Sequence, residues 1–279
     1  MDAGTTWSLV LTSLTLLVAL GLAYRPLGDY IARIYTGERD LAVERGAYRL
    51  IGVDPRGSQT WQAYLRSVLL FSAVGVALVY ALQRLQPLLP YSMGLDAPGE
   101  ALSFNTAVSF VTNTNWQSYG GETTLGYTVQ FAALTVQNFV SAAVGIAVAV
   151  ALVRGFAYRR SGVIGNFWVD LVRGTYRLLL PISVLAALAL LAGGVIQNLN
   201  GFTDATTNGG GVFNVNAAHP YENPAPWTNL LEIFLLLVIP FSMPRAFGRI
   251  VGDDRQGYAI LGVMASIFVA STALLTWAE

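Results

Sequence analysis

Two uncharged polar segments stand out in a chain that is otherwise strongly apolar. They are Thr112–Gln117 and Thr207–Gly211, and they consist of Thr, Asn and Gly with one Trp and one Gln. A cation pathway can replace an ion's water shell with main-chain carbonyl oxygens, and it then needs short segments without a fixed charge that would trap the ion. Such segments between apolar runs predict part of a pathway for a monovalent cation.

Composition assigns the chain to the integral membrane proteins. Hydrophobic residues make up 54% and charged residues 11% of 279 positions, far from the roughly one quarter charged that is typical of a soluble domain. A soluble protein with buried helices would need polar faces at helical spacing, and the apolar runs lack them. We therefore expect an all-α fold with about six transmembrane helices. The predicted spans are Trp7–Tyr24, Ser67–Gln83, a stretch within Thr123–Val153, a stretch within Leu178–Thr203, Trp227–Pro244 and Gln256–Ala278.

The arginines predict the orientation. Fifteen of the sixteen basic residues fall in alternate loops, which the positive-inside rule assigns to the cytoplasm. Both ends and both polar segments are then expected on the outer side. Asp2 precedes the first apolar run and Arg25 follows it, so the run lacks the basic start of a signal peptide and is expected to remain as a span.

Several chemistries are disfavoured by what the sequence contains. All basic residues are arginine, so neither a P-loop nor an Asp-Lys-Thr-Gly phosphorylation motif can be written, and any energy for pumping would come from another subunit. The acids lie mostly in predicted loops beside a single His, which makes catalysis improbable, and a net charge of zero gives no sign of a nucleic-acid partner. No catalytic residue and no bound cofactor is predicted.

Two isolated residues leave alternatives open. His219 and Glu222 have a spacing that can bind metal on a helix, but Pro220 and Pro224 argue against a helix, so structural support is the favoured interpretation. Glu232 is the one acid inside a predicted span, which makes it a candidate for ion passage. It also lies close enough to the outer end to reach the interface.

The loop before Thr112 has room for a re-entrant helix. Ser103–Phe110 has the length of a short helix, and the polar segment follows it directly. Irregular backbone at membrane depth is tolerated only where protein or a water-filled cavity surrounds it. The segment is therefore expected to line a pore, and the alternative is an exposed surface loop.

Longer motifs around both segments resemble a known family. Val111–Tyr119 and Thr207–Pro224 are similar to the first and second filter regions of the KdpA family, the potassium-binding subunits of Kdp potassium-transporting ATPases. Gly165–Asp170 and Gly252–Gly257 are similar to cytoplasmic turns of that family. The resemblance implies a channel-like fold of helix–pore loop–helix units in a bacterial inner (plasma) membrane. It also implies potassium as the transported ion and partners comprising a P-type ATPase catalytic subunit, small accessory membrane subunits and membrane lipid.

Carried onto this chain, the resemblance implies two filter strands. The potassium ion would be held by main-chain carbonyls, and the implied residues are Asn113, Thr114 and Asn115 in the first strand and Thr207, Asn208 and Gly209 in the second, with Trp116 and Gln117 supporting the first. The implied division is a leading helix and cytoplasmic loop (1–60), a first unit (61–155), a second unit (156–250) and the start of a third (251–279).

The chain departs from the family pattern in two ways. It has half the family's length and so half of its four filter strands, and the family's longer segment before Thr207 is missing, which leaves the second unit without its pore helix. The second strand can then sit as an outer loop instead. A nonfunctional gene fragment, or a structural subunit without transport, remains the alternative function. Ion affinity and selectivity are not predicted.

Overall fold

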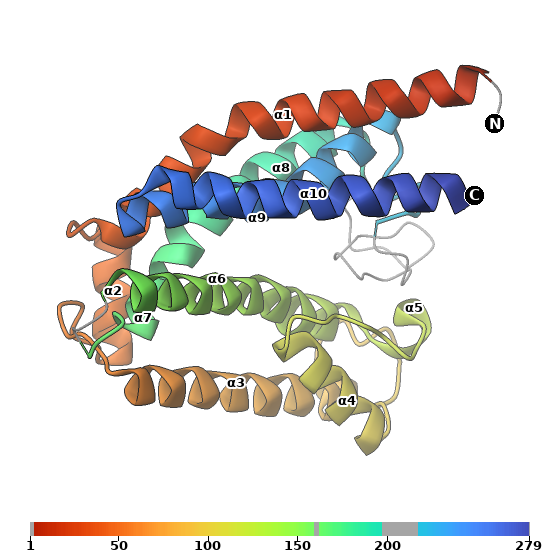
Figure 1. Cartoon of the computed structure of the whole chain (residues 1–279). Helices are drawn as coiled ribbons and strands as arrows, with labels where there is room; N and C mark the ends of the chain where they lie inside the picture. The colour runs from red at the N-terminus through yellow and green to blue at the C-terminus, as the bar shows by residue number, and fades with distance from the viewer. Residues whose placement is uncertain (1–2, 159–161, 197–216, 279) are drawn as a thin grey trace. The chain divides into compact units, whose positions relative to one another are not determined.

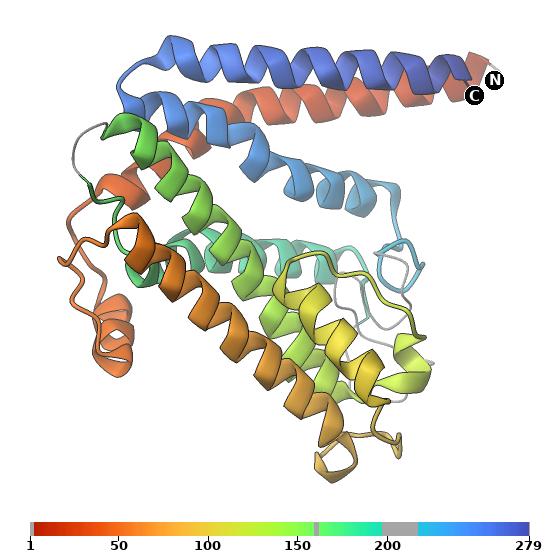
Figure 2. The ribbon, with the colours of Figure 1, turned by 60° about the horizontal axis from the view of Figure 1, so that its bottom comes forward.

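The computed structural model describes residues 3–158, 162–196 and 217–278, and the described residues fold into helices joined by loops (Figures 1 and 2). Two segments, η2 and η3, are π-helical and lead directly into α6 and α8, and η1 is a single 3₁₀ turn. The elements are α1 (Ala3–Thr36), α2 (Ala42–Ile51), α3 (Trp61–Arg84), η1 (Gln86–Leu88), α4 (Glu100–Val111), α5 (Gly121–Thr124), η2 (Val129–Thr135), α6 (Val136–Ala157), α7 (Phe167–Arg173), η3 (Gly174–Leu179), α8 (Leu180–Ala192), α9 (Pro226–Val251) and α10 (Asp254–Ala278).

Six helical segments are long and apolar enough to cross a membrane, which confirms the predicted all-α integral membrane fold. They are Val10–Thr36, Trp61–Arg84, Val129–Ala157, Phe167–Ala192, Pro226–Val251 and Asp254–Leu275. The helices extend beyond the uncharged runs on which the prediction rested. Long arginine side chains at helix ends can reach the interface, so a charged residue does not end a span.

The fourth span differs most from the prediction, which placed it within Leu178–Thr203, whereas the structure has Phe167–Ala192. The helical segment begins at Phe167, where the side chain of Asn166 caps the main-chain N–H of Trp168 at 3.1 Å, and it continues through η3 into α8. Arg173 and Arg177 therefore lie inside the helix. Their charges are tolerated there because each is paired with an acid from the segment before α3.

These two ion pairs attach α2 and the residues directly before it to η3 and α7. Arg173 Nη2 lies 2.9 Å from the Asp40 carboxylate, and Arg177 donates from Nε and Nη2 to the two carboxylate oxygens of Glu44. Glu44 is fully buried, and its carboxylate also accepts from the main-chain N–H of Leu41 at 2.7 Å, which caps α2. A buried carboxylate is stable only when it is paired and hydrogen-bonded, and here both conditions are met.

Removing the charge of Glu44 is expected to destabilise the protein strongly. Glu44→Gln keeps an oxygen for the cap but leaves the Arg177 guanidinium partly buried without a countercharge, which typically costs about 3 to 5 kcal/mol. Glu38→Gln is the matched control, because Glu38 is an exposed acid on the same connecting segment. Thermal unfolding in detergent should show a large loss of stability for the first variant and little change for the second. Equal melting curves would contradict the account of this pair.

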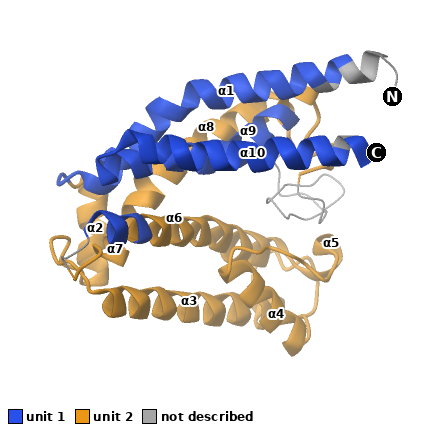
Figure 3. Cartoon of the chain, in the orientation of Figure 1, with its two compact units in different colours: residues 1–39, 152–160, 229–279 blue, residues 40–151, 161–228 orange. Residues whose placement is uncertain are grey.

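The chain divides into two compact units, shown in different colours in Figure 3. Unit 1 comprises residues 1–39, 152–160 and 229–279, and unit 2 comprises residues 40–151 and 161–228. α6 and α9 each contribute to both units. The four-part division predicted from sequence remains a prediction.

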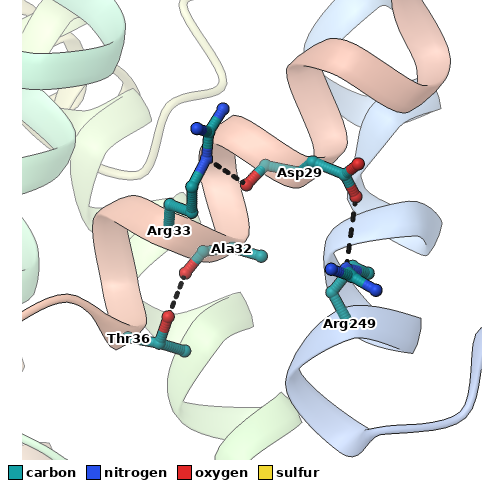
Figure 4. A pocket seen from close by; sticks show the side chains of 5 residues that line it. All are labelled: Asp29, Ala32, Arg33, Thr36 and Arg249. Carbon is teal, nitrogen blue, oxygen red and sulfur yellow. Dashed lines mark hydrogen bonds and ion pairs between the residues drawn. The ribbon is translucent and has the colours of Figure 1, made fainter.

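Unit 1 is held together by Arg245 of α9. Its guanidinium lies 2.8 Å from Asp29 of α1 and 2.6 Å from Asp254 of α10, so one cation joins three helices. α1 and α9 meet closely at Gly28, because a Cβ there would lie 2.4 Å from the Cβ of Arg245. Asp29 also contacts Arg249 at 3.4 Å beside a hollow of about 420 Å³ (Figure 4). The hollow is lined by Asp29, Ala32, Arg33, Thr36 and Arg249.

Unit 2 contains the first predicted pore loop. α4 packs against α3 and η2 in an apolar cluster at the end of α3 remote from α2 (Figures 1 and 2). The buried members of this cluster are Val79, Ala107, Phe110, Leu125, Val129, Ala133 and Leu134. A second cluster around Tyr64 and Phe167 joins α3, α6 and α7 nearer their other ends. α4 is thus fixed to two spans before the polar segment begins.

Candidate functional site

The first polar segment follows a half-helix. α4 has 12 residues, which at about 1.5 Å per residue is roughly 18 Å and too short to cross about 30 Å of hydrocarbon. Glu100 lies in its first turn and no basic residue lies in its last, so the negative end of the helix dipole faces the polar segment uncompensated by side-chain charge. The predicted short helix at Ser103–Phe110 therefore exists, and it ends where the polar segment starts.

α4 ends in a Schellman motif in which Asn113 takes the left-handed position. The main-chain N–H of Thr114 donates to the Ser109 carbonyl at 3.0 Å, and the N–H of Asn113 donates to the Phe110 carbonyl at 3.2 Å. This pair of bonds requires a positive φ at the residue between the helix and Thr114. Asn113 has φ of 58°, and Asn is one of the few residues with a side chain that accept this conformation readily.

Ser109 holds the segment from both its main chain and its side chain. Its carbonyl also accepts the N–H of Asn115 at 3.4 Å, and its buried hydroxyl donates to the carbonyl of Trp116 at 3.0 Å. The segment is therefore curled back over the last turn of α4. The N–H groups of Thr114 and Asn115 point toward α4, where both donate to the Ser109 carbonyl.

The carbonyl oxygens at the start of the same segment behave differently from its N–H groups. Among the described residues, no hydrogen bond is accepted by the main-chain oxygens of Asn113, Thr114 or Asn115. Asn115 also has a positive φ of 59°, whereas Thr114 does not, so the sign of φ alternates along the three residues. Such alternation gathers successive N–H groups on one side of a strand and successive carbonyls on the other. The segment can thus present a row of acceptors.

α6 supports the segment from the side. The hydroxyl of Ser141, itself buried, donates to Asn113 Oδ1 at 3.0 Å. The side-chain hydroxyls of Thr112 and Thr114 contact each other at 2.9 Å. Asn115 Oδ1 is buried and has no hydrogen-bond partner in the described part of the chain. A buried acceptor without a donor is unusual, and a cation is one group that would satisfy it.

The two predicted supporting residues occupy different settings. Trp116 is 45% exposed, and its main-chain carbonyl accepts a hydrogen bond from the Ser109 hydroxyl. Gln117 is half-buried, and its Nε2 donates to the hydroxyl of Tyr119 at 3.0 Å. Burial raises the pKa of Tyr119 to about 12, and hydrogen bonds from Gln117 and Thr106 partly offset this effect.

Three buried glutamines, which the sequence reasoning missed, fix the surrounding loops. Gln86 accepts from the N–H of Gly126 at 2.9 Å and donates to the carbonyls of Asp96 and Thr124. Gln83 donates to the carbonyl of Ser103 at 3.0 Å, and Gln130 donates to that of Gly121 at 3.2 Å. The signal was available, because each is a polar residue at the edge of an apolar run. Their partners are main-chain groups, which a sequence pattern does not reveal.

The remaining sequence candidates are not brought into this loop. Thr207, Asn208 and Gly209 lie outside the described residues. Glu232 lies on α9 within unit 1 and is half-buried. The main-chain N–H groups of Glu222 and Asn223 both donate to the His219 carbonyl at 2.9 Å, so His219 is part of a turn. Within the described ranges, no group of three or more His, Asp or Glu residues is placed to hold a metal.

Fold and loop together define a polytopic α-helical membrane protein in which a half-helix, α4, leads into a curled polar segment. The family model for KdpA, described as "Potassium-transporting ATPase A subunit", matches residues 14–207 and 203–279. These ranges cover most of the sequence, and the chain therefore belongs to the KdpA family.

Individual relatives agree with the family match. Proteins called "Potassium-transporting ATPase potassium-binding subunit" are 59% identical in Clavibacter sepedonicus, 56% in Mycobacterium avium and 53% in Cutibacterium acnes. The aligned regions cover 97%, 94% and 98% of this chain and 53%, 52% and 54% of those relatives. The chain thus spans about half the length of the curated relatives that it matches.

The comparisons also bear on the missing segment. The two matched ranges overlap at residues 203–207, where the second polar segment begins. The alignment with the Clavibacter sepedonicus protein runs over 294 positions, more than the 279 residues of the whole chain, so that relative has residues in the aligned region that this chain lacks. Both findings agree with the predicted internal deletion.

Loss of the Ser109 hydroxyl is expected to loosen the segment. Ser109→Ala leaves the Trp116 carbonyl without its buried donor, which should cost about 1 to 2 kcal/mol of stability. Ser118→Ala is the matched control, because Ser118 is exposed in the same loop. Thermal unfolding of the two variants in detergent measures the difference. Identical stabilities would show that the Ser109 bond does not hold the loop.

The raised pKa of Tyr119 predicts a loss of stability at alkaline pH. An ordinary tyrosine ionises near pH 10, so between about pH 10 and 12 the unfolded chain releases this proton while the folded chain keeps it. The stabilisation is complete below pH 10 and falls as the pH approaches 12. Tyr119→Phe should therefore lose less stability between pH 9 and 11.5 than the native chain, as measured by unfolding midpoints. Equal losses would contradict the burial of this hydroxyl.

Proposed function

We propose that this chain is the potassium-binding and translocating part of an ATP-driven potassium uptake complex. The carbonyl oxygens of Asn113, Thr114 and Asn115 would replace part of the ion's water shell. Membership of the KdpA family and the printed names of the relatives support potassium as the ion. Trp116 and Gln117 would support the strand, and Thr207, Asn208 and Gly209 would supply a second strand.

One observation carries the proposal: among the described residues, no donor reaches the carbonyls of Asn113, Thr114 or Asn115, while the N–H groups of the same residues donate to carbonyls of α4. A segment with this polarity is suited to cations, because acceptors face outward and no fixed charge is present to hold the ion too tightly. The uncompensated C-terminal end of α4 adds a partial negative charge at the same point. Together these features favour a cation over an anion or an uncharged solute.

The energy for transport would come from a partner subunit. The sequence contains no lysine and cannot form the usual nucleotide-hydrolysing motifs, so a P-type ATPase catalytic subunit would couple ATP hydrolysis to movement of the ion. Small accessory membrane subunits would complete the complex. The protein would lie in the inner membrane of a bacterium with its N-terminus outside, and Glu232 would be a secondary candidate for contact with the ion.

A structural or assembly role without transport is the second candidate. It is favoured by the chain's coverage of only about half of each relative, since a ring of carbonyls needs strands that this chain does not supply by itself. A separate polypeptide carrying the other units would remove this objection. The two candidates differ in whether the conformation of residues 113–115 affects transport.

The decisive comparison changes backbone conformation while leaving every main-chain carbonyl in the sequence. Asn113→Gly retains easy access to positive φ, whereas Asn113→Val does not, because a β-branched residue is strongly disfavoured there. Each variant would be produced together with a polypeptide that supplies the rest of a relative's length and with the other subunits, in cells that lack potassium uptake. Growth at limiting potassium is the readout.

The Gly variant should sustain growth and the Val variant should abolish it at low potassium but not at high potassium. Ser118→Val is the matched control and should behave as the native chain. Western blotting of membranes checks that all variants accumulate equally. Equal growth of the Gly and Val variants would exclude this segment from the ion pathway and favour the assembly role.

A further inference from the structure

Helix α2 carries an exposed apolar stripe that neither the fold nor the proposed pathway uses. Val43, Leu50 and Ile51 recur at positions i, i+7 and i+8, which lie on one face of a helix, whereas Ala47 at the edge of this face packs against the cluster around Tyr48. Val43 is 49%, Leu50 89% and Ile51 44% exposed. A short helix with a largely exposed leucine needs an explanation, because Glu44 and Tyr48, which pack against the rest of unit 2, lie on another face.

The three faces of α2 have distinct chemistry. Glu44 and Tyr48, one turn apart, form the face that packs on α7, where Tyr48 meets Val169 and Val172. At 100° per residue, Arg45 and Arg49 lie on the side opposite the apolar stripe, and the packed face lies between the two. α2 is thus held to α7 by one face, and of its two remaining faces one is apolar and the opposite one is basic.

α2 also has the direction and the level of an interfacial helix. Its axis runs across that of α3 at the end where α3 begins, rather than along it (Figure 1). α3 opens with Trp61, which is 59% exposed. Tryptophan at the ends of spans is typical of the headgroup level of a bilayer. The beginning of α3, beside which α2 lies in Figure 1, thus carries a residue typical of the level where lipid headgroups meet acyl chains.

We propose that α2 is an in-plane membrane helix that inserts Val43, Leu50 and Ile51 into the bilayer and binds the phosphates of anionic lipids through Arg45 and Arg49. Apolar burial and attraction to anionic headgroups are the two contributions that bind such helices to a membrane surface. The charge favours lipid over a protein groove, because a purely apolar groove would offer no anionic partner to Arg49, or to the donors of Arg45 that remain beside its Nη1 bond to the Asp40 carbonyl at 3.0 Å. The ion pairs of Asp40 and Glu44 would then transmit the position of α2 to α7.

The absence of cysteine from the sequence allows a direct test. Single-cysteine variants Leu50→Cys and Arg49→Cys place nitroxide labels on adjacent residues of different faces, and Val43→Cys and Arg45→Cys form a second pair. The chain is reconstituted in phosphatidylcholine vesicles with or without phosphatidylglycerol. Collision rates are measured with oxygen, which partitions into lipid, and with a nickel chelate, which stays in water.

Labels at 43 and 50 should collide with oxygen several-fold more than with the nickel chelate, and labels at 45 and 49 should show the reverse. Phosphatidylglycerol should reduce the mobility of the label at 50, and Arg45→Gln with Arg49→Gln should abolish this response. A label at 50 that is as accessible to nickel as one at 49 would overturn the proposal. Protection of that label from both relaxants would also overturn it and would indicate a protein partner. None of these readouts depends on ion transport.

Discussion

The curled segment after α4 depends on one residue, Ser109, whose carbonyl accepts two N–H groups and whose hydroxyl holds the next carbonyl along. Backbone inside a membrane has no water to satisfy it, so an irregular segment persists only where protein supplies its partners. The Ser109 carbonyl accepts the N–H groups of Thr114 and Asn115, but its hydroxyl donates only to the Trp116 carbonyl and not to the carbonyls of residues 113–115. Among the described residues, the N–H groups of the segment have acceptors while the carbonyls of Asn113, Thr114 and Asn115 have no donor, and this asymmetry is the basis of the proposed cation site.

The rest of unit 2 keeps that segment in place. Buried glutamines tie the flanking loops to α3 and η2, and Ser141 reaches from α6 to Asn113. At the other end of α3, ion pairs from Asp40 and Glu44 keep two arginines inside the fourth helical segment. The same principle applies at both ends, because these glutamines, arginines and Ser141, which the membrane would penalise, have partners within the chain.

The sequence predicted the class, the six spans and the half-helix, because apolar runs and a polar segment are local signals. It misplaced the start of the fourth span, since Arg173 and Arg177 count as loop residues until their distant partners are known. It also identified Asn113 and Asn115 without the reason for asparagine, which is the positive φ at both positions. Ser109 and Ser141 escaped notice because a serine in an apolar helix has no pattern that distinguishes support from chance.

The central claim is that the carbonyls of Asn113, Thr114 and Asn115 hold an alkali cation. Its most direct test is a density map of this chain, assembled with the remaining units and subunits and prepared in thallium, an electron-dense substitute for potassium. The account predicts a strong peak within coordination distance of these three oxygens that disappears when thallium is replaced by sodium. A map in which the same oxygens contact only water, with the thallium peak elsewhere, would contradict it.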